Sequence, residues 1–238
     1  MQPGRIVIVK LGSASPTLVR RRGDYEDYFA HGIGVPVEHC LVVDPGKDEP
    51  LPDARSIAGV LLTGSDAMVT ENHPWSLRTR EWLERPLRRK VPVFGICYGH
   101  QLLAQALGGT VGWNPKGLEV GTITVDLSAA AQTDPLFGGL PGTLVVQAYH
   151  SQSVLALPPG SRVLAGNAHD PVQAFAWGEA AWGVQFHPEF DADITRTYVE
   201  EDRAELRDQG QDPETLLAHC RDSGHGTTLL RRFAQLLD

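Results

Sequence analysis

The first half of the chain alternates short apolar runs with longer stretches of helical periodicity. The runs at residues 6–9, 37–43, 60–62 and 91–96 predict buried strands, and the stretches at 24–31, 75–90 and 102–107 predict helices. Asp24 is a typical N-cap residue for the first of these helices, and Gly32 is a typical residue at which it would stop. Strands that alternate with helices in this way indicate a parallel, doubly wound sheet.

From residue 109 to residue 183 the pattern changes. Strand-like runs at residues 121–127, 143–148, 162–165 and 172–177 alternate with turns, and little helical pattern separates them. This favours an antiparallel meander attached to the parallel sheet.

Past Phe190 the chain becomes helical and charged. Apolar residues recur there at helical spacing and predict a stripe that faces the core: Leu229, Leu230, Phe233, Leu236 and Leu237. No repeat, low-complexity segment or linker interrupts the chain. We therefore expect one α/β domain over residues 1–238, with a mainly parallel, doubly wound central sheet and an antiparallel extension.

Composition narrows the function classes. The net charge of −8 argues against a nucleic-acid partner, which usually leaves a basic footprint. The basic run at residues 20–22 is short and is followed closely by acidic residues, so we expect a solvated loop there rather than a phosphate site.

Cysteine usage and hydropathy point to the cytoplasm. The three cysteines include no CxxC pair, which suggests neither a disulfide framework nor a zinc site and fits a reducing compartment. The first residues lack the long apolar region of a signal peptide, and no apolar run approaches the length that spans a membrane. We expect a cytoplasmic protein without a membrane partner.

The sequence Gly95-Ile96-Cys97-Tyr98-Gly99 lies between a predicted strand and a predicted helix. This Gly-x-Cys-x-Gly pattern is typical of a nucleophile elbow in which cysteine replaces serine. The N-terminus of the following helix favours the thiolate form of Cys97. The alternative is a buried structural cysteine, but the paired glycines favour the nucleophile.

A base for this cysteine is predicted at His187. His187-Pro188-Glu189 follows a strand-like stretch at residues 181–184. In extended geometry residues i and i+2 point to the same side, so Glu189 can orient the imidazole of His187. A surface loop with an incidental His-Pro-Glu is the alternative, and His100 and His150 are rival bases. Gly64, Cys97 and His187 all follow predicted strands, and active sites of such sheets lie at the carboxyl ends of strands.

These residues carry a family resemblance. The two motifs, their order and their separation resemble the class I glutamine amidotransferases. Residues 63–66 (Thr-Gly-Ser-Asp) resemble the glycine loop of that family, although many members have two glycines and a proline there. Residues 116–121 and 149–154 resemble two stretches near the glutamine pocket. Residues 23–29 resemble the first helix of stand-alone members similar to the amidotransferase part of GMP synthase.

The resemblance implies roles for individual residues. Cys97, His187 and Glu189 would form the triad that hydrolyses the side-chain amide of glutamine; Gly64, Ser65 and Tyr98 would form the oxyanion hole; and Gln101, His150 and Ser151 would contact the substrate. For Gln101, a role in capping or buttressing the turn is an equal alternative. The reaction requires no metal and no organic cofactor.

The fate of the ammonia stays open. The chain has no Walker phosphate loop and no Ser-Gly-Gly-x-Asp-Ser loop, so a separate synthetase subunit would use the ammonia. Alternatively, the protein is a free-standing hydrolase of γ-glutamyl peptides or a non-catalytic regulatory relative. A third alternative is a cysteine hydrolase or stress protein of the related elbow-bearing folds, in which a distal His-Pro-Glu is unexpected.

Overall fold

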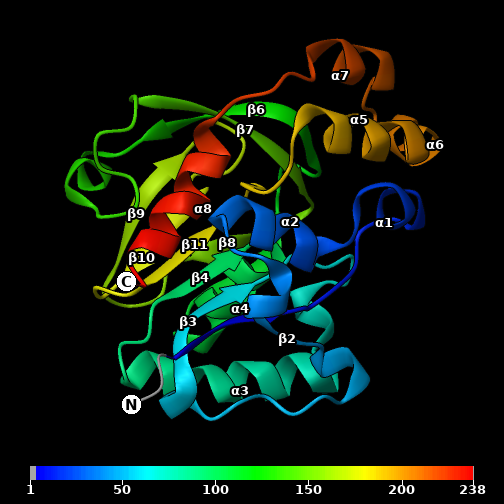
Figure 1. The fold of residues 1–238 in the computed structure, drawn as a ribbon. Helices are drawn as coiled ribbons and strands as arrows, with labels where there is room; N and C mark the ends of the chain where they lie inside the picture. The colour runs from blue at the N-terminus through cyan, green and yellow to red at the C-terminus, as the bar shows by residue number, and fades with distance from the viewer. Residues whose placement is uncertain (1–3, 238) are drawn as a thin grey trace.

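The computed structural model describes residues 4–237, and a nine-stranded sheet runs through it (Figure 1). Its strands are β1 (Arg5–Val9), β2 (Leu41–Val43), β3 (Ile57–Leu62), β4 (Val93–Ile96), β6 (Glu119–Leu127), β7 (Thr143–His150), β9 (Ser161–Gly166), β10 (Ala174–Trp177) and β11 (Ala181–Val184). Their spatial order is β2-β1-β3-β4-β11-β10-β9-β6-β7. The strands from β2 to β11 in this order pair in parallel, and the others continue the sheet with antiparallel pairings. The predicted α/β sheet with an antiparallel extension is confirmed.

Helices cover both faces of the parallel half. In chain order the helices of the structure are α1 (Pro16–Arg22), α2 (Tyr25–Ile33), α3 (Pro74–Arg88), α4 (Tyr98–Ala106), α5 (Ala192–Glu201), α6 (Arg203–Asp208), α7 (Pro213–His219) and α8 (His225–Gln235). Helices α2 and α8 pack together on one face, and α3 and α4 pack together on the other (Figure 1). Successive side chains of β1 point to opposite faces of the sheet. Ile8 packs in the core under α2 and α8, whereas Val7 and Val9 pack in the core under α3 and α4.

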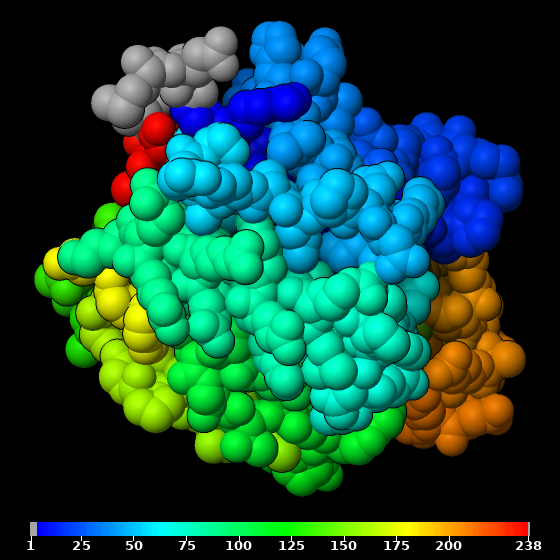
Figure 2. All heavy atoms as spheres, turned by 90° about the horizontal axis from the view of Figure 1, so that it is seen from below, coloured from blue at the N-terminus to red at the C-terminus, as the bar shows by residue number. Residues whose placement is uncertain are grey.

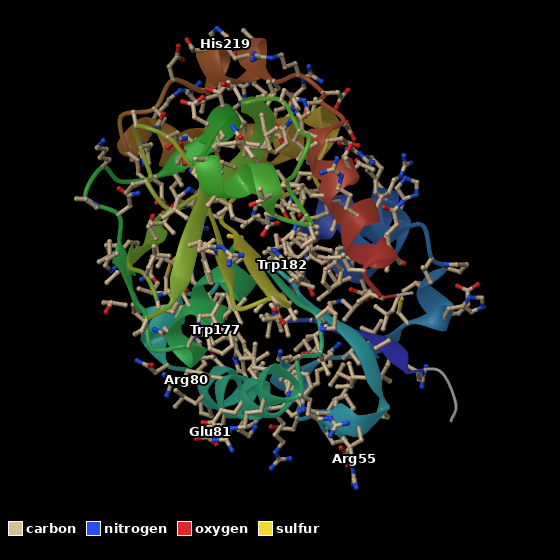
Figure 3. All side chains as sticks on the ribbon, turned by 90° about the vertical axis from the view of Figure 1, so that its left-hand side faces the viewer. Arg55, Arg80, Glu81, Trp177, Trp182 and His219 are labelled. Carbon is tan, nitrogen blue, oxygen red and sulfur yellow. The ribbon has the colours of Figure 1, made fainter. Side chains whose placement is uncertain are left out.

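The space-filling and side-chain views show these two layers. Figure 2 looks at the molecule from the α3 side, and this helix spreads across the centre of that face. In Figure 3, Arg80 and Glu81 point outward from the same helix, whereas Trp182 lies in the interior on the α8 side of the sheet. The indole nitrogen of Trp182 donates to the buried carboxylate of Asp134.

The helices α5, α6 and α7 form a small cap on the antiparallel half (Figure 1). Val199 and Leu206 from this cap pack on Leu118 and Val120, and the four side chains form a separate apolar cluster. A two-stranded sheet of β5 (Thr110–Trp113) and β8 (Gln152–Ala156) lies outside the main sheet and was not predicted.

Two element boundaries differ from the prediction. In place of one strand over residues 37–43, a 3₁₀ turn (Val37–His39) precedes the short β2, and the Cys40 N–H closes this turn on the Val37 carbonyl at 3.0 Å. Gly32 does not stop α2. A Cβ on Gly32 would lie 2.3 Å from the Leu230 side chain, so this glycine permits the close packing of α2 on α8. The helix ends at Gly34, whose φ of 74° favours glycine.

Two further predictions are wrong. The basic run at residues 20–22 is the last turn of α1 rather than a loop, because Ser15 caps that helix and Pro16 starts it. Arg21 and Arg22 pair with Asp193 and Asp191 on α5, each at 2.6 Å. Leu236 is not in the core, since α8 ends one residue before it and its side chain is 36% exposed.

A buried ion cluster holds the start of α2 against the end of β1. The Lys10 ammonium contacts the Asp24 carboxylate at 2.6 Å and the Glu26 carboxylate at 2.9 Å. Asp24 also accepts hydrogen bonds from the N–H groups of Ala14 and Tyr25. Burial alone would raise the pKa of Asp24, but Lys10 and the two N–H donors outweigh it and lower the pKa below its usual value. Asp24 therefore serves both as the N-cap of α2, as predicted, and as a counter-ion of Lys10, which was not predicted.

We expect Asp24→Ala to destabilise the protein by about 3 kcal/mol in urea unfolding, because it leaves a buried lysine with one partner fewer and removes a helix cap. Asp24→Asn keeps the cap and should cost less. As a control, Glu179→Gln breaks only the exposed pair with Lys90 and should leave the unfolding midpoint unchanged. Equal midpoints for Asp24→Ala and the control would show that the cluster does not stabilise the fold.

Candidate active site

Cys97 lies on a tight turn between β4 and α4, as predicted. Its φ of 50° and ψ of −104° place a non-glycine residue in a strained conformation. The flanking glycines make this turn possible. A Cβ on Gly95 would lie 2.4 Å from the Gly99 carbonyl oxygen, and a Cβ on Gly99 would lie 2.5 Å from the Leu62 carbonyl oxygen. Backbone strain of this kind is typical of functional residues.

His187 and Glu189 form a buried pair just beyond β11. The imidazole Nδ1 is 2.8 Å from the Glu189 carboxylate, and the side chains are 4% and 0% exposed. The His187 N–H donates to the Gln147 carbonyl at 2.8 Å, which fixes the backbone. The ring stacks on Phe190 with centroids 4.0 Å apart. The two side chains thus meet as the i, i+2 spacing predicted.

His187 also faces Cys97. A Cβ on Gly64 would lie 3.0 Å from the His187 ring and 3.9 Å from the Cys97 side chain, so the three residues meet at one point. Burial alone would lower the pKa of His187, but the charges of Glu189 and of the Cys97 thiolate outweigh it and raise the pKa to about 10. An imidazolium here is stabilised from both sides. The Cys97 thiol also lies 3.7 Å from the Tyr149 carbonyl oxygen, to which it can donate.

The three residues predicted for an oxyanion hole surround Cys97. Gly64 lies against its side chain, Tyr98 follows it, and Ser65 lines the same pocket. The Thr63 hydroxyl donates to the Gly64 carbonyl oxygen at 2.9 Å and so holds the Gly64–Ser65 peptide. Within residues 4–237, the N–H groups of Ser65 and Tyr98 have no protein hydrogen-bond partner, which leaves them available to a ligand.

Neither of the two rival bases faces Cys97 with an available ring nitrogen. His100 is fully buried between Gly183 and Phe175 and does not line the pocket. Burial lowers the pKa of His100 to about 3. His150 does line the pocket, but its Nδ1 is 3.0 Å from the Gln152 carbonyl oxygen and its Nε2 is 2.9 Å from the Glu119 carboxylate. Neither ring nitrogen of His150 is available to Cys97.

Gln101 and Ser151 also line the pocket. The Gln101 side-chain nitrogen donates to the Gln152 carbonyl oxygen at 2.8 Å and to the Gln185 side-chain oxygen at 3.0 Å. These two hydrogen bonds hold the Gln101 side chain against β8 and against the segment that leads to His187, and its own side-chain oxygen remains for a ligand. The Ser151 carbonyl accepts from the Asn114 N–H.

Cys97, His187 and these neighbours open into one pocket with a volume of about 370 Å³. Its aromatic wall consists of Tyr25, Tyr149, Phe190 and Tyr198. Of these, sequence reasoning placed only Tyr149 near the pocket, within the stretch at residues 149–154. Phe190 directly follows the His-Pro-Glu motif, so a local signal existed for it. Tyr198 stands on α5 with no such signal. Four carboxylate residues, Asp66, Glu201, Asp202 and Glu205, also line the pocket.

The described part of the chain has neither a metal-binding cluster nor a membrane-spanning helix. Among residues 4–237, no group of three or more His, Cys, Asp or Glu side chains is arranged to hold a metal ion. Within the same residues, no helix has both the length and the apolar character needed to cross a membrane.

Comparisons with known proteins agree with this geometry. The family model of class I glutamine amidotransferases matches residues 46–204. The chain is 47% identical over 173 residues to a GMP synthase of Parafrankia sp. This alignment covers 70% of this chain and 30% of that enzyme. The chain is 34% identical over 143 residues to a glutamine-hydrolyzing GMP synthase subunit of Pyrococcus abyssi, covering 59% of this chain and 71% of that protein.

A crystal structure of a glutamine amidotransferase from Thermotoga maritima aligns over 100% of both chains with a TM-score of 0.75 and 21% identity, and so shows the same fold. The chain spans less than two thirds of several curated relatives, with 58% of a Saccharomyces cerevisiae homologue and 31% of a Thermomicrobium roseum GMP synthase. The matched family residues include the elbow and the His-Pro-Glu motif. The chain belongs to the class I glutamine amidotransferase family.

Proposed function

We propose that the protein hydrolyses the side-chain amide of glutamine through Cys97, His187 and Glu189, and that it releases glutamate and ammonia for transfer to an acceptor. The observation that carries this proposal is the strained Cys97 turn that shares one pocket with a buried His187–Glu189 pair. The names of the GMP synthase relatives, which include the term glutamine-hydrolyzing, support the choice of substrate.

In the first half of the reaction, His187 takes the proton of the Cys97 thiol and the thiolate forms a bond to the amide carbon. The oxyanion receives hydrogen bonds from the N–H groups of Tyr98 and of Gly64 or Ser65, each worth roughly 3 kcal/mol. The imidazolium of His187 then gives its proton to the amide nitrogen as the C–N bond breaks, and ammonia leaves. Glu189 stabilises the charged ring throughout.

In the second half, water gives a proton to His187 and attacks the thioester carbon. The C–S bond breaks, glutamate leaves, and the thiol recovers its proton. Gln101 offers its side-chain oxygen, because both hydrogens of its side-chain nitrogen are already donated. That oxygen suits the α-ammonium group of glutamine, and Ser151 lies beside it in the pocket wall.

A separate synthetase subunit would use the ammonia. The name of the Pyrococcus abyssi relative, a subunit of a glutamine-hydrolyzing GMP synthase, supports this choice. The alternative is a free-standing hydrolase of γ-glutamyl compounds. The aromatic wall of Tyr25, Phe190 and Tyr198 favours it, since this wall provides apolar surface for a leaving group larger than ammonia.

Cys97→Ser should lower glutamine-dependent ammonia release by at least about 10³-fold and abolish labelling by a diazoketone analogue of glutamine, because the hydroxyl is a far weaker nucleophile. Cys40→Ala and Cys220→Ala are the controls. Burial raises the pKa of both of these thiols, and both lie outside the pocket. Labelling that persists in Cys97→Ser would contradict the assignment of the nucleophile.

His187→Ala should cost nearly as much activity as Cys97→Ser, and the double variant should lose little more, since the two residues act as one unit.

Glu189→Gln should retain measurable turnover, but the pH dependence of this turnover should change. Because Glu189 raises the pKa of His187, its neutralisation should move the alkaline limb of kcat/KM from near pH 10 to lower pH. An alkaline limb that stays in place would show that Glu189 does not stabilise the imidazolium.

We expect weak glutaminase activity from the isolated chain, because a subunit that hydrolysed glutamine freely would lose ammonia before its transfer. The measurement is ammonia or amine release from glutamine and from a panel of γ-glutamyl peptides and amines. Turnover of one γ-glutamyl compound at an ordinary enzymatic rate, on the order of 10 s⁻¹, would replace the subunit interpretation with that of a free-standing hydrolase.

A further inference from the structure

Glu119 and His150 form a buried hydrogen-bonded pair behind the pocket. They are direct cross-strand partners at the ends of β6 and β7, and their side chains are 8% and 1% exposed. The His150 ring has an acceptor on each side, the Glu119 carboxylate and the Gln152 carbonyl oxygen. Each ring nitrogen of His150 thus faces a hydrogen-bond acceptor, which fixes the ring between Glu119 and Gln152.

Glu119 is also held by two amides. Its carboxylate oxygens accept from the Asn167 side-chain nitrogen at 2.7 Å and from the Gln173 side-chain nitrogen at 2.5 Å. Burial alone would raise the pKa of Glu119, but His150 and Asn167 outweigh it and keep the pKa below its usual value. Removing one partner from a buried carboxylate that accepts this many hydrogen bonds is costly.

The pair connects to the substrate pocket through one carbonyl group. The Gln152 carbonyl oxygen accepts both from His150 and from the Gln101 side-chain nitrogen. A carbonyl cannot donate, so this contact orients the Gln101 amide with its nitrogen toward Gln152. Gln101 is itself one turn beyond the nucleophile, since its N–H donates to the Cys97 carbonyl at 3.1 Å.

The second hydrogen bond of the Gln101 nitrogen goes to Gln185, which is two residues before His187. The hydrogen-bonded chain therefore runs from β6 through β7 and α4 to the segment that carries the base. With both hydrogens of the Gln101 nitrogen donated, only its side-chain oxygen is left for a ligand.

We propose that Glu119 and His150 are positioning residues that fix the Gln101 amide, so that the pocket presents an acceptor and selects amides with a donor group at the position of the glutamine α-ammonium. This inference rests on the proposed function, because it concerns the same pocket. It gives His150 a role different from the direct substrate contact that the sequence suggested.

The test compares L-glutamine with glutaramic acid, the same amide without the α-amino group. In the wild-type chain we expect a kcat/KM ratio well above one in favour of glutamine. In Glu119→Gln this ratio should fall by about 10²-fold, as expected for a misplaced positioning group. Glu119→Asp, which keeps the carboxylate, should restore part of the ratio. Glu84→Gln, which touches only an exposed pair with Arg88, is the matched control and should keep the wild-type ratio.

Two further measurements separate positioning from folding and from catalysis. Alkylation of Cys97 by iodoacetamide should proceed at the wild-type rate in Glu119→Gln, because it does not use Gln101. Protection of Cys97 against this reagent by glutamine, but not by glutaramic acid, reports binding even in a chain that does not turn over. If Glu119→Gln does not fold, His150→Gln, which retains an amide donor for Gln152 but no charge, takes its place.

The outcomes are distinct. Loss of selectivity with retained alkylation supports the positioning role. Equal losses for the two substrates, or a wild-type chain that binds and hydrolyses both alike, overturn it. A wild-type chain that glutamine protects but that hydrolyses neither amide overturns the proposed function and, when Glu119→Gln removes that protection, supports the positioning role.

Discussion

The site depends on the left-handed backbone of Cys97. A φ of 50° costs a non-glycine residue roughly 1–3 kcal/mol, so the surroundings must hold it. Here the turn is held by the close approach of Gly95 to Gly99 and of Gly99 to Leu62, where no side chain fits. The N–H of Cys97 also donates to the Val184 carbonyl at 2.8 Å, so the neighbouring strand β11 fixes the turn from its other side. Strand pairing thus fixes Cys97 and the segment that leads to His187 relative to each other.

Parallel pairing then determines which residues meet. Because β3, β4 and β11 are adjacent and parallel, their carboxyl ends lie at one edge of the sheet. Gly64, Cys97 and His187 each follow one of these ends, and they meet although they are far apart in sequence. Glycine at position 64 is favoured by contact rather than by backbone conformation, since a Cβ there would lie only 3.0 Å from the His187 ring.

The sequence predicts the parts of this arrangement that rest on local rules. The Gly-x-Cys-x-Gly turn, the strand alternation and the i, i+2 spacing of His187 and Glu189 are local patterns, and the structure places all of them as expected. Gly32 was misinterpreted as a helix stop. A glycine is needed there because of a tertiary contact, since the Leu230 side chain packs across α2 at this position. Tyr198 and the β5–β8 pair were missed because they depend on contacts between segments that no local pattern records.

The three histidines near the elbow show why motif order alone does not assign a base. His100 is one turn from the nucleophile, but it is enclosed by Gly183 and the Phe175 ring without a charged partner, and its pKa falls to about 3. His150 has a charged partner, but its two nitrogens are committed to Glu119 and Gln152. His187 alone combines an anionic neighbour on one ring nitrogen with the nucleophile nearby, and its pKa rises to about 10. Burial is common to all three rings, so the difference in chemistry comes from what each ring nitrogen faces.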